Sequence, residues 1–421
     1  MLTYPYSGGA PTGVDWRYAT PNYGAWSDGT NLYYREYSDL FTTSNLSQFP
    51  TITTLYSGAG LSVPSGYMGG TWHNWPNTTT TSIVTGLGTE QLDDMGMTFK
   101  TVRSHDYFPN STGSVRWHHL ETSKGTFVWT NLDKFVNDHY AAGYDIIYTL
   151  GYSPAWATGT GSGDSHYDNG AVPISSSNPP TSLTDWTDYC SAVATRYTGK
   201  IKYYEIWNEP DQGSSFWNGT QTQYAQLLRL ANQTIKAIDA SALIMGPASS
   251  RVDSTGRSWL TSMFAASDGA SGTGATGSSG QKWIDVISIH NYYSGTLNAT
   301  SFLSDLTSYK SILSSNGYGS KEIWVNECGI NSVHMASNED VQMKYFLRQL
   351  YMMATQGISR IVWYDMDGSL LSPFRKTGNL SHWANIWNTH RGYLVNGQVT
   401  LVNRLADGTL AVTANGSNFL I

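Results

Sequence analysis

Short apolar runs alternate with amphipathic stretches along most of this 421-residue chain. From residue 66 onward, short runs such as "ALIM" and "IWV" are continuous and apolar, as the strands of a buried parallel sheet require. The stretches between them carry apolar residues at helical spacing and end at glycine, as "NLDKFVNDHYAAG" does. About eight strand–helix units follow one another in this way, which predicts an α/β fold, a (β/α)8 TIM barrel.

The two ends of the chain have a different pattern. Residues 1–65 are rich in Gly, Ser and Tyr with little periodicity, which predicts an extension of loops and short strands. After Gly368 the helical signal weakens, and "GQVTLVNRLADGTLAVTANGSNFLI" alternates around a turn at Asp407-Gly408. We therefore expect a barrel at 66–385 and a small antiparallel β appendage at 386–421, to which the N-terminal extension is a candidate contributor.

Two predicted strands end in the same dipeptide, Asn-Glu. Glu209 follows the fourth strand, where Pro210 prevents a central strand from continuing, and Glu327 follows the seventh. Taken alone, each would be read as a surface or ion-pair residue. In a barrel, however, strands four and seven face each other and function lies at their carboxyl ends. The two carboxyl groups should then converge on one cavity, as cleavage of a glycosidic bond requires.

The two carboxyl groups need different surroundings if one is to donate a proton and the other is to stay ionised. Pro210 and neighbouring aromatic residues predict an apolar setting for Glu209, as suits a protonated acid. Glu327 needs cations or hydrogen-bond donors. Arg103 at the end of the second strand and Tyr292 at the end of the sixth are the candidates.

Composition narrows the class of protein. Only 13% of residues are charged, and 16 Trp and 28 Tyr are present, a mixture typical of extracellular sugar-handling proteins. The net charge of -7, without a basic run, argues against nucleic-acid binding, and no apolar run has membrane-spanning length. The segment "MLTYPYSGG" lacks the pattern of a signal peptide. We expect a secreted protein whose signal peptide is absent from this sequence, and a carbohydrate as its partner.

Metal and cofactor signals are weak. The histidine pair at 118–119 and His105 lack the further ligands of a metal site, so we expect neither a metal nor a cofactor. Cys190 and Cys328 also lack metal-ligand spacing. Two buried thiols and a disulfide both remain open for them.

At this point the chain resembles glycoside hydrolase family 39, within the clan of retaining barrel hydrolases that includes family 5. The similar segments are "YYEIWNEPDQGSSFWNGTQTQYAQLLRLANQTIKAIDASALIMGPA", "TVRSHD", "LDKFVNDHYAAGYDIIYTLGYSPAWA" and "SIHNYY", within about residues 66–368. The resemblance departs in two places. Asn326 precedes Glu327 where the family more often has Thr, and the C-terminal remainder is too short for the full β-sandwich of many family xylosidases.

The resemblance implies a retaining glycoside hydrolase that cleaves an oligo- or polysaccharide by double displacement. Glu209 would be the general acid/base and Glu327 the nucleophile, with Asn208 hydrogen-bonding the sugar 2-hydroxyl. The supporting residues divide into two that would hold the nucleophile, Arg103 and Tyr292, and two that would line the sugar pocket, His105 and His290.

Three tryptophans follow predicted strands, namely Trp156, Trp217 and Trp363. An indole face stacks well on a sugar, but tryptophan is equally a core residue, and both interpretations stay open. Two other functions also stay open. A non-catalytic carbohydrate-binding barrel would have the same fold. A transglycosylase would use the same two carboxylates and differ only in the acceptor.

Overall fold

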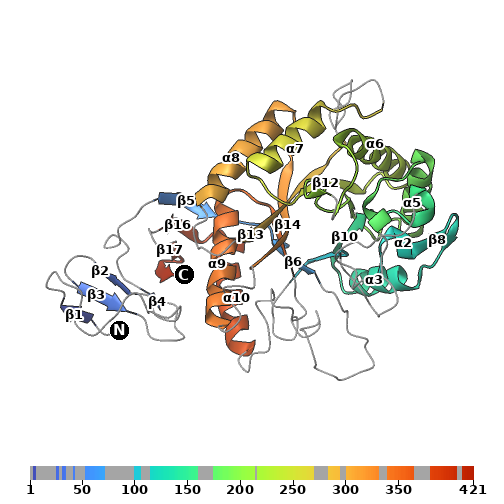
Figure 1. Cartoon of the computed structure of the whole chain (residues 1–421). Coiled ribbons are helices and arrows are strands. Elements are labelled where there is room, and N and C mark those ends of the chain that lie inside the picture. Colours follow the sequence, from blue (N-terminus) through green and yellow to red (C-terminus); the bar gives the residue numbers. More distant parts are fainter. Residues whose placement is uncertain are drawn as a thin grey trace.

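The computed structural model (Figure 1) describes the parts of the chain listed here: residues 3–5, 25–27, 31–34, 41–42, 53–71, 99–105, 114–159, 174–213, 216–269, 283–293, 300–330, 339–364, 380–404 and 410–421. The predicted helix ending at Gly96 lies outside these residues.

Eight parallel strands form a closed barrel, which confirms the predicted (β/α)8 fold. Each strand pairs with the next along the chain, and β15 pairs with β6 to close the ring. In chain order the strands are β6 (Met68–Thr71), β7 (Thr101–Arg103), β10 (Asp145–Leu150), β11 (Tyr203–Ile206), β12 (Leu243–Ser249), β13 (Val286–Tyr293), β14 (Glu322–Ile330) and β15 (Arg360–Trp363).

Helices cover the outside of the barrel (Figure 1). Their buried faces carry apolar residues at helical spacing, as in α6, where Tyr224, Leu228 and Ile235 are buried. The helices are α2 (Trp117–Leu120), α3 (Thr130–Ala141), α4 (Ala155–Thr158), α5 (Leu183–Arg196), α6 (Gln221–Ile238), α7 (Ser254–Ala265), α8 (Thr300–Ser315), α9 (Glu339–Thr355) and α10 (Leu380–Val395), with a 3-10 turn at Ile174–Ser177. In the described parts of the chain, no helix is both long and apolar enough to span a membrane.

The barrel interior is layered. A buried apolar cluster takes one residue from each of six strands: Ile147, Tyr203, Met245, Val286, Trp324 and Val362. Two positions further along their strands, on the same face, lie Thr149, Glu205 and Asn326, all buried and polar. The barrel therefore changes from apolar to polar toward the carboxyl ends of its strands.

The β-rich appendage is also present. A five-stranded sheet has the order β4-β18-β17-β16-β5 and combines C-terminal strands with two from the N-terminal extension, as the sequence suggested. Arg348 of α9 donates to the backbone carbonyl of Ile421 (2.7 Å), which ties the end of this sheet to the barrel helices. The strands are β4 (Phe41–Thr42), β5 (Thr53–Leu61), β16 (Val399–Arg404), β17 (Leu410–Ala414) and β18 (Ser417–Leu420). Smaller sheets contain β1 (Thr3–Pro5), β2 (Ala25–Ser27) and β3 (Asn31–Tyr34), and β8 (Glu121–Ser123) with β9 (Thr126–Phe127).

Helix α10 was not predicted. It crosses the expected boundary between residues 385 and 386, so residues 386–395 are helical and do not belong to the sheet. Its sequence, "LSHWANIWNTHRGYLV", is rich in residues of modest helix propensity, which hid the helix. Packing holds it instead: His390 accepts or donates a hydrogen bond with the Tyr351 hydroxyl (2.7 Å) and its ring packs on Phe419. Cys190 and Cys328 are free, buried thiols.

Candidate active site

Glu209 lies in a tight turn directly after β11. Trp207 and Glu209 have φ values of 64° and 44°, in the left-handed region that non-glycine residues rarely adopt. Neighbouring strands hold this turn, because Trp207 N–H donates to the Leu150 carbonyl (2.7 Å) and Glu209 N–H to that of Ala248 (3.2 Å). Unfavourable backbone of this kind costs of order 1–3 kcal/mol per residue and concentrates at functional sites. The turn thus fixes the direction of the Glu209 side chain.

Glu327 is not at a strand end, contrary to the sequence prediction. Strand β14 continues to Ile330, and its pairing with both neighbours shifts register around Glu327. Such a bulge re-aims a side chain without ending the strand. The prediction took the polar Asn326-Glu327 pair as a stop signal, whereas the bulge accommodates it inside the strand.

Arg103, at the end of β7, connects three acidic or amide side chains and has no exposed surface. Its Nη1 donates to Glu327 Oε2 (2.5 Å) and its Nη2 to Asn208 Oδ1 (2.6 Å). Its Nε donates to Glu205 Oε2 (2.8 Å). Because Asn208 accepts through its oxygen, its amide nitrogen stays oriented to donate elsewhere.

The surroundings of Glu327 favour its ionised form. Burial raises the pKa of this carboxyl, but the nearby His290 and Arg103 charges outweigh burial and hold the pKa below its ordinary value. The Tyr292 hydroxyl donates to Oε1 (2.5 Å), on the opposite oxygen from Arg103. Arg103 and Tyr292 therefore both contact Glu327, and their role in holding a nucleophile stays a prediction.

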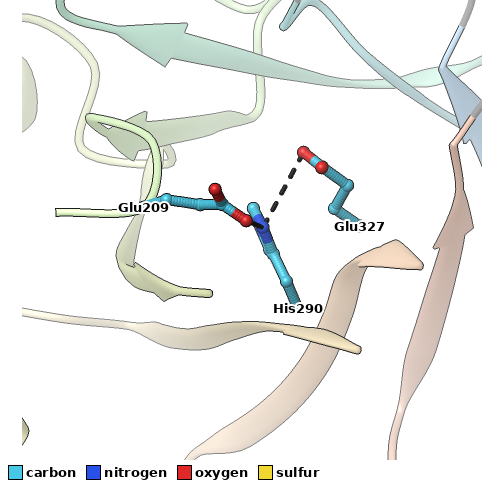
Figure 2. Close-up of side chains that lie close together, drawn as sticks. All are labelled: Glu209, His290 and Glu327. Atoms are coloured by element: carbon cyan, nitrogen blue, oxygen red, sulfur yellow. Dashed lines mark hydrogen bonds and ion pairs between the residues drawn. The ribbon is translucent and has the colours of Figure 1, made fainter. Parts of the chain in front are cut away.

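His290 lies between the two glutamates (Figure 2). Its Nδ1 is 2.7 Å from Glu209 Oε1 and 3.8 Å from Glu327 Oε2. Burial acts to lower the pKa of His290, yet the two carboxylates raise it above its ordinary value. The sequence predicted apolar surroundings for Glu209, whereas the structure places an imidazole nitrogen within hydrogen-bond distance of its carboxyl group.

The other predicted site residues divide into two groups. His105 lies in the site, with Nδ1 4.0 Å from Glu327 Oε2 and Nε2 3.0 Å from the Tyr152 hydroxyl.

The three tryptophans make contacts typical of a core. Trp156 is partly buried and donates through its indole N–H to the Glu121 carbonyl (2.9 Å). Trp363 is fully buried and packs edge-on against a phenylalanine of α9, while Trp217 packs against Trp207. The structure surrounds these indoles with core contacts, and their part in sugar binding stays a prediction.

One atom each from Glu209, His290 and Glu327 lie within 4.8 Å of one another, so the three side chains have the composition of a metal site. The surroundings oppose a cation there. Arg103 and Tyr292 already donate to the two oxygens of Glu327, and a guanidinium 2.5 Å from a ligand oxygen repels a second positive charge. We interpret the cluster as a proton-sharing group.

Sequence reasoning missed two buried polar residues beneath the glutamates, Thr149 and Glu205, and interpreted Asn326 only as part of a strand end. Glu205 accepts hydrogen bonds from both Thr149 and Asn326. A signal was present, since Glu205 interrupts the apolar run "YYEIW" four residues before Glu209. A charge inside a buried strand requires partners that periodicity alone cannot identify.

Comparison with known proteins gives the family. The model of glycosyl hydrolases family 39 matches residues 89–314. A beta-xylosidase from Caldicellulosiruptor saccharolyticus is 28% identical over 165 residues, which cover 37% of this chain and only 31% of that enzyme.

Solved structures share the fold. A monomeric beta-xylosidase from Caulobacter crescentus CB15 has a TM-score of 0.56 at 18% identity, covering 85% of this chain and 75% of that one. A family 39 glycoside hydrolase from Xanthomonas axonopodis pv. citri has a TM-score of 0.54 at 18% identity, covering 87% and 73%. At this identity the structures support the architecture alone, whereas the family model covers more than half of the chain. The chain therefore belongs to glycosyl hydrolase family 39.

Proposed function

We propose that this protein is a retaining glycoside hydrolase that cleaves O-glycosidic bonds of an oligo- or polysaccharide by double displacement. The spacing of the two carboxylates carries the proposal, because an oxygen of Glu209 and one of Glu327 lie within 4.8 Å. Retaining enzymes have carboxyl groups about 5–5.5 Å apart, whereas inverting enzymes need about 6.5–9.5 Å to admit a water molecule. A binding barrel without catalysis would need no such pair.

Glu327 is the proposed nucleophile. Its lowered pKa keeps it ionised, and Arg103 and Tyr292 hold its two oxygens. In the first step a Glu327 oxygen forms a bond to the anomeric carbon while the bond to the leaving oxygen breaks. The electron pair of that bond goes to the leaving oxygen, which takes a proton from Glu209.

Glu209 is the proposed acid and then base. His290 Nδ1 is hydrogen-bonded to Oε1 of Glu209, which leaves Oε2 to deliver the proton to the leaving group. In the second step Glu209 takes a proton from water, whose oxygen attacks the anomeric carbon and releases Glu327. Asn208 and His105 are proposed to contact the sugar.

The substrate is proposed to be a carbohydrate, with a β-xyloside as the first to test, because the curated relative is a beta-xylosidase. That match covers less than a third of the relative, so the sugar is part of the proposal. Low charge and abundant Trp and Tyr also support our proposal that the protein is secreted.

Azide separates the two roles. In Glu209→Ala, an aryl glycoside with a good leaving group should still form the glycosyl-enzyme, and azide should restore turnover with retained configuration, since azide needs no base. In Glu327→Gly, hydrolysis should be abolished, and azide attacking the substrate directly should give the inverted product. Product configuration is measured by NMR across a panel of aryl glycosides. Azide products of one configuration from both variants would show that the roles are wrongly assigned.

A further inference from the structure

A third carboxylate lies beneath the two glutamates of the proposed mechanism. Glu205, in β11, has no exposed surface, and its oxygens accept hydrogen bonds from three other barrel strands. Oε2 accepts from Arg103 Nε (2.8 Å) and from Thr149 Oγ1 (2.9 Å), and Oε1 accepts from Asn326 Nδ2. These bonds occupy both oxygens, which leaves Glu205 poorly placed to react with a substrate.

A charge at this depth calls for an explanation. Taking a carboxylate out of water is unfavourable unless it is paired and hydrogen-bonded, and a protein with an apolar residue of similar size at such a position is often at least as stable. The neighbouring layer of the same barrel is apolar, with Tyr203 two residues earlier on the same face of β11. Packing alone therefore does not account for Glu205.

The geometry of Arg103 suggests what Glu205 does. A guanidinium is planar, so fixing Nε and the side-chain direction also fixes where the two terminal nitrogens lie. One of these nitrogens donates to Glu327, and the other, which also lies 2.7 Å from Glu205 Oε2, donates to Asn208. An arginine without its Nε partner would be free to rotate away from this double contact.

We propose that Glu205 is a positioning residue that acts through Arg103 to set the orientations of Glu327 and Asn208. Asn326 links Glu205 to the strand that carries Glu327. This inference rests on the proposed roles of Glu327 and Asn208, but it concerns a residue that touches neither the substrate nor Glu209.

A double-mutant cycle tests the proposal. Glu205→Gln keeps the shape but removes the negative charge and one of the two acceptor oxygens, so Arg103 loses its ion pair with Glu205 and at least one of the three donors loses its bond. We expect kcat/KM on an aryl glycoside to fall by about ten- to a hundredfold, as remote misplacement of reacting groups does. If Glu205 acts through Arg103, the Arg103→Lys, Glu205→Gln double variant should lose little more than Arg103→Lys alone. Losses that multiply would overturn the proposal.

Glu121→Gln is the matched control. Glu121 is also a buried glutamate, accepting from the Trp117 indole N–H and the Gly125 N–H (both 2.7 Å), but on β8. Both variants should lower the melting temperature, while only Glu205→Gln should lower kcat/KM. An equal loss of kcat/KM in Glu205→Gln and Glu121→Gln would show that Glu205 has only a structural role and would contradict the proposal. If Glu205→Gln does not fold, Thr149→Val replaces it in the same cycle with a severalfold expected loss.

A crystal structure of the same variant distinguishes failure of this inference from failure of the proposed function. If the wild-type protein hydrolysed no glycoside, the proposed function would be wrong. Even in that case, the positioning role predicts that Arg103 loses its contact with Glu327 or with Asn208 in Glu205→Gln crystals. An unchanged Arg103 in those crystals would overturn the positioning role, whatever the activity.

Discussion

Arg103 and Arg360 lie at opposite ends of the barrel, and each donates to a carboxylate and to a neutral polar side chain. Arg103 ends β7 and contacts Glu327 and Asn208, which belong to the proposed active site. Arg360 begins β15, where it donates to Thr101 Oγ1 and Asp145 Oδ2 (both 2.6 Å). In (β/α)8 barrels the carboxyl ends of the strands carry function and the other end serves stability. Substitution of Arg103 is therefore expected to affect mainly activity, and substitution of Arg360 mainly stability.

The interior layers show what this division costs. Toward the Arg360 end, the guanidinium lies 4.3 Å from the ring centroid of Trp324, within the apolar layer. Two residues further along β14, the buried side chain is that of Asn326, which is polar. Apolar burial stabilises the fold, whereas the interactions of buried polar groups are largely offset by their desolvation. The site end therefore gives up stability for fixed polar geometry, in line with the usual conflict between activity and stability.

Arg103→Lys has the largest expected effect on this comparison. Lys cannot reproduce the planar fork that holds two side chains, so kcat/KM should fall by about a hundredfold or more while the protein stays folded. Arg360→Lys should leave kcat/KM near the wild-type value. Steady-state kinetics on an aryl glycoside measure both. Similar losses in the two variants would erase the functional difference between the two ends.

Tyr292→Phe should have the next largest effect. It removes the hydroxyl that donates to Glu327 (2.5 Å), and a hydrogen bond to a charged group contributes about 1.5–3 kcal/mol, or roughly ten- to a hundredfold in kcat/KM. Tyr309→Phe is the control, because the buried Tyr309 hydroxyl pairs with Ser249 Oγ (2.8 Å) instead of a site carboxylate. A loss in the control that matched Tyr292→Phe would contradict the assignment.

His290→Asn should move the pH dependence. The His290 charge lowers the pKa of Glu327, so its removal should raise that pKa and shift the acidic limb of kcat/KM to higher pH. The same lowered pKa also makes the stability of the fold depend on pH. A carboxyl with a lowered pKa stabilises the fold above its unfolded pKa, and that stabilisation is lost as pH falls through the folded value. An acidic limb that stayed in place, measured from kcat/KM between acid and neutral pH, would exclude His290 as the dominant cation.

The barrel and the two glutamates were predictable from the sequence, because apolar periodicity is local and strand order fixes which ends face each other. The partners of Glu209 were not, since the His290 contact depends on a bulge that shifts register between Ile289 and His290. Helix α10 was missed because packing against Tyr351 and Phe419 outweighs its weak propensity. Glu205 was missed because a buried charge can be interpreted only once the three donors around it are known.

The smallest effect is expected at the stabilising end, where Arg360→Met should lower the melting temperature and leave kcat/KM unchanged. Met keeps apolar contact with Trp324 but loses both hydrogen bonds. Because the Arg360 and Asp145 side chains are 12% and 31% exposed, solvent screens their ion pair, and we expect the free energy of unfolding to fall by about 1 kcal/mol and the melting temperature by a few degrees.

Arg196→Met is the matched control for this last change. Arg196 also lies over an indole, 4.8 Å from the Trp129 ring centroid, and pairs with Asp133, but the two charged side chains are 40% and 32% exposed. This combination of a guanidinium, an indole and a carboxylate lies outside the barrel and is more exposed, so Arg196→Met should lower the melting temperature less than Arg360→Met does. Thermal unfolding at fixed protein concentration measures both shifts. The assay is run well below the melting temperature of Arg360→Met. A lowered kcat/KM under these conditions would mean that a change at the Arg360 end reaches the site through the apolar layer, so that the two ends of the barrel would not have separate roles.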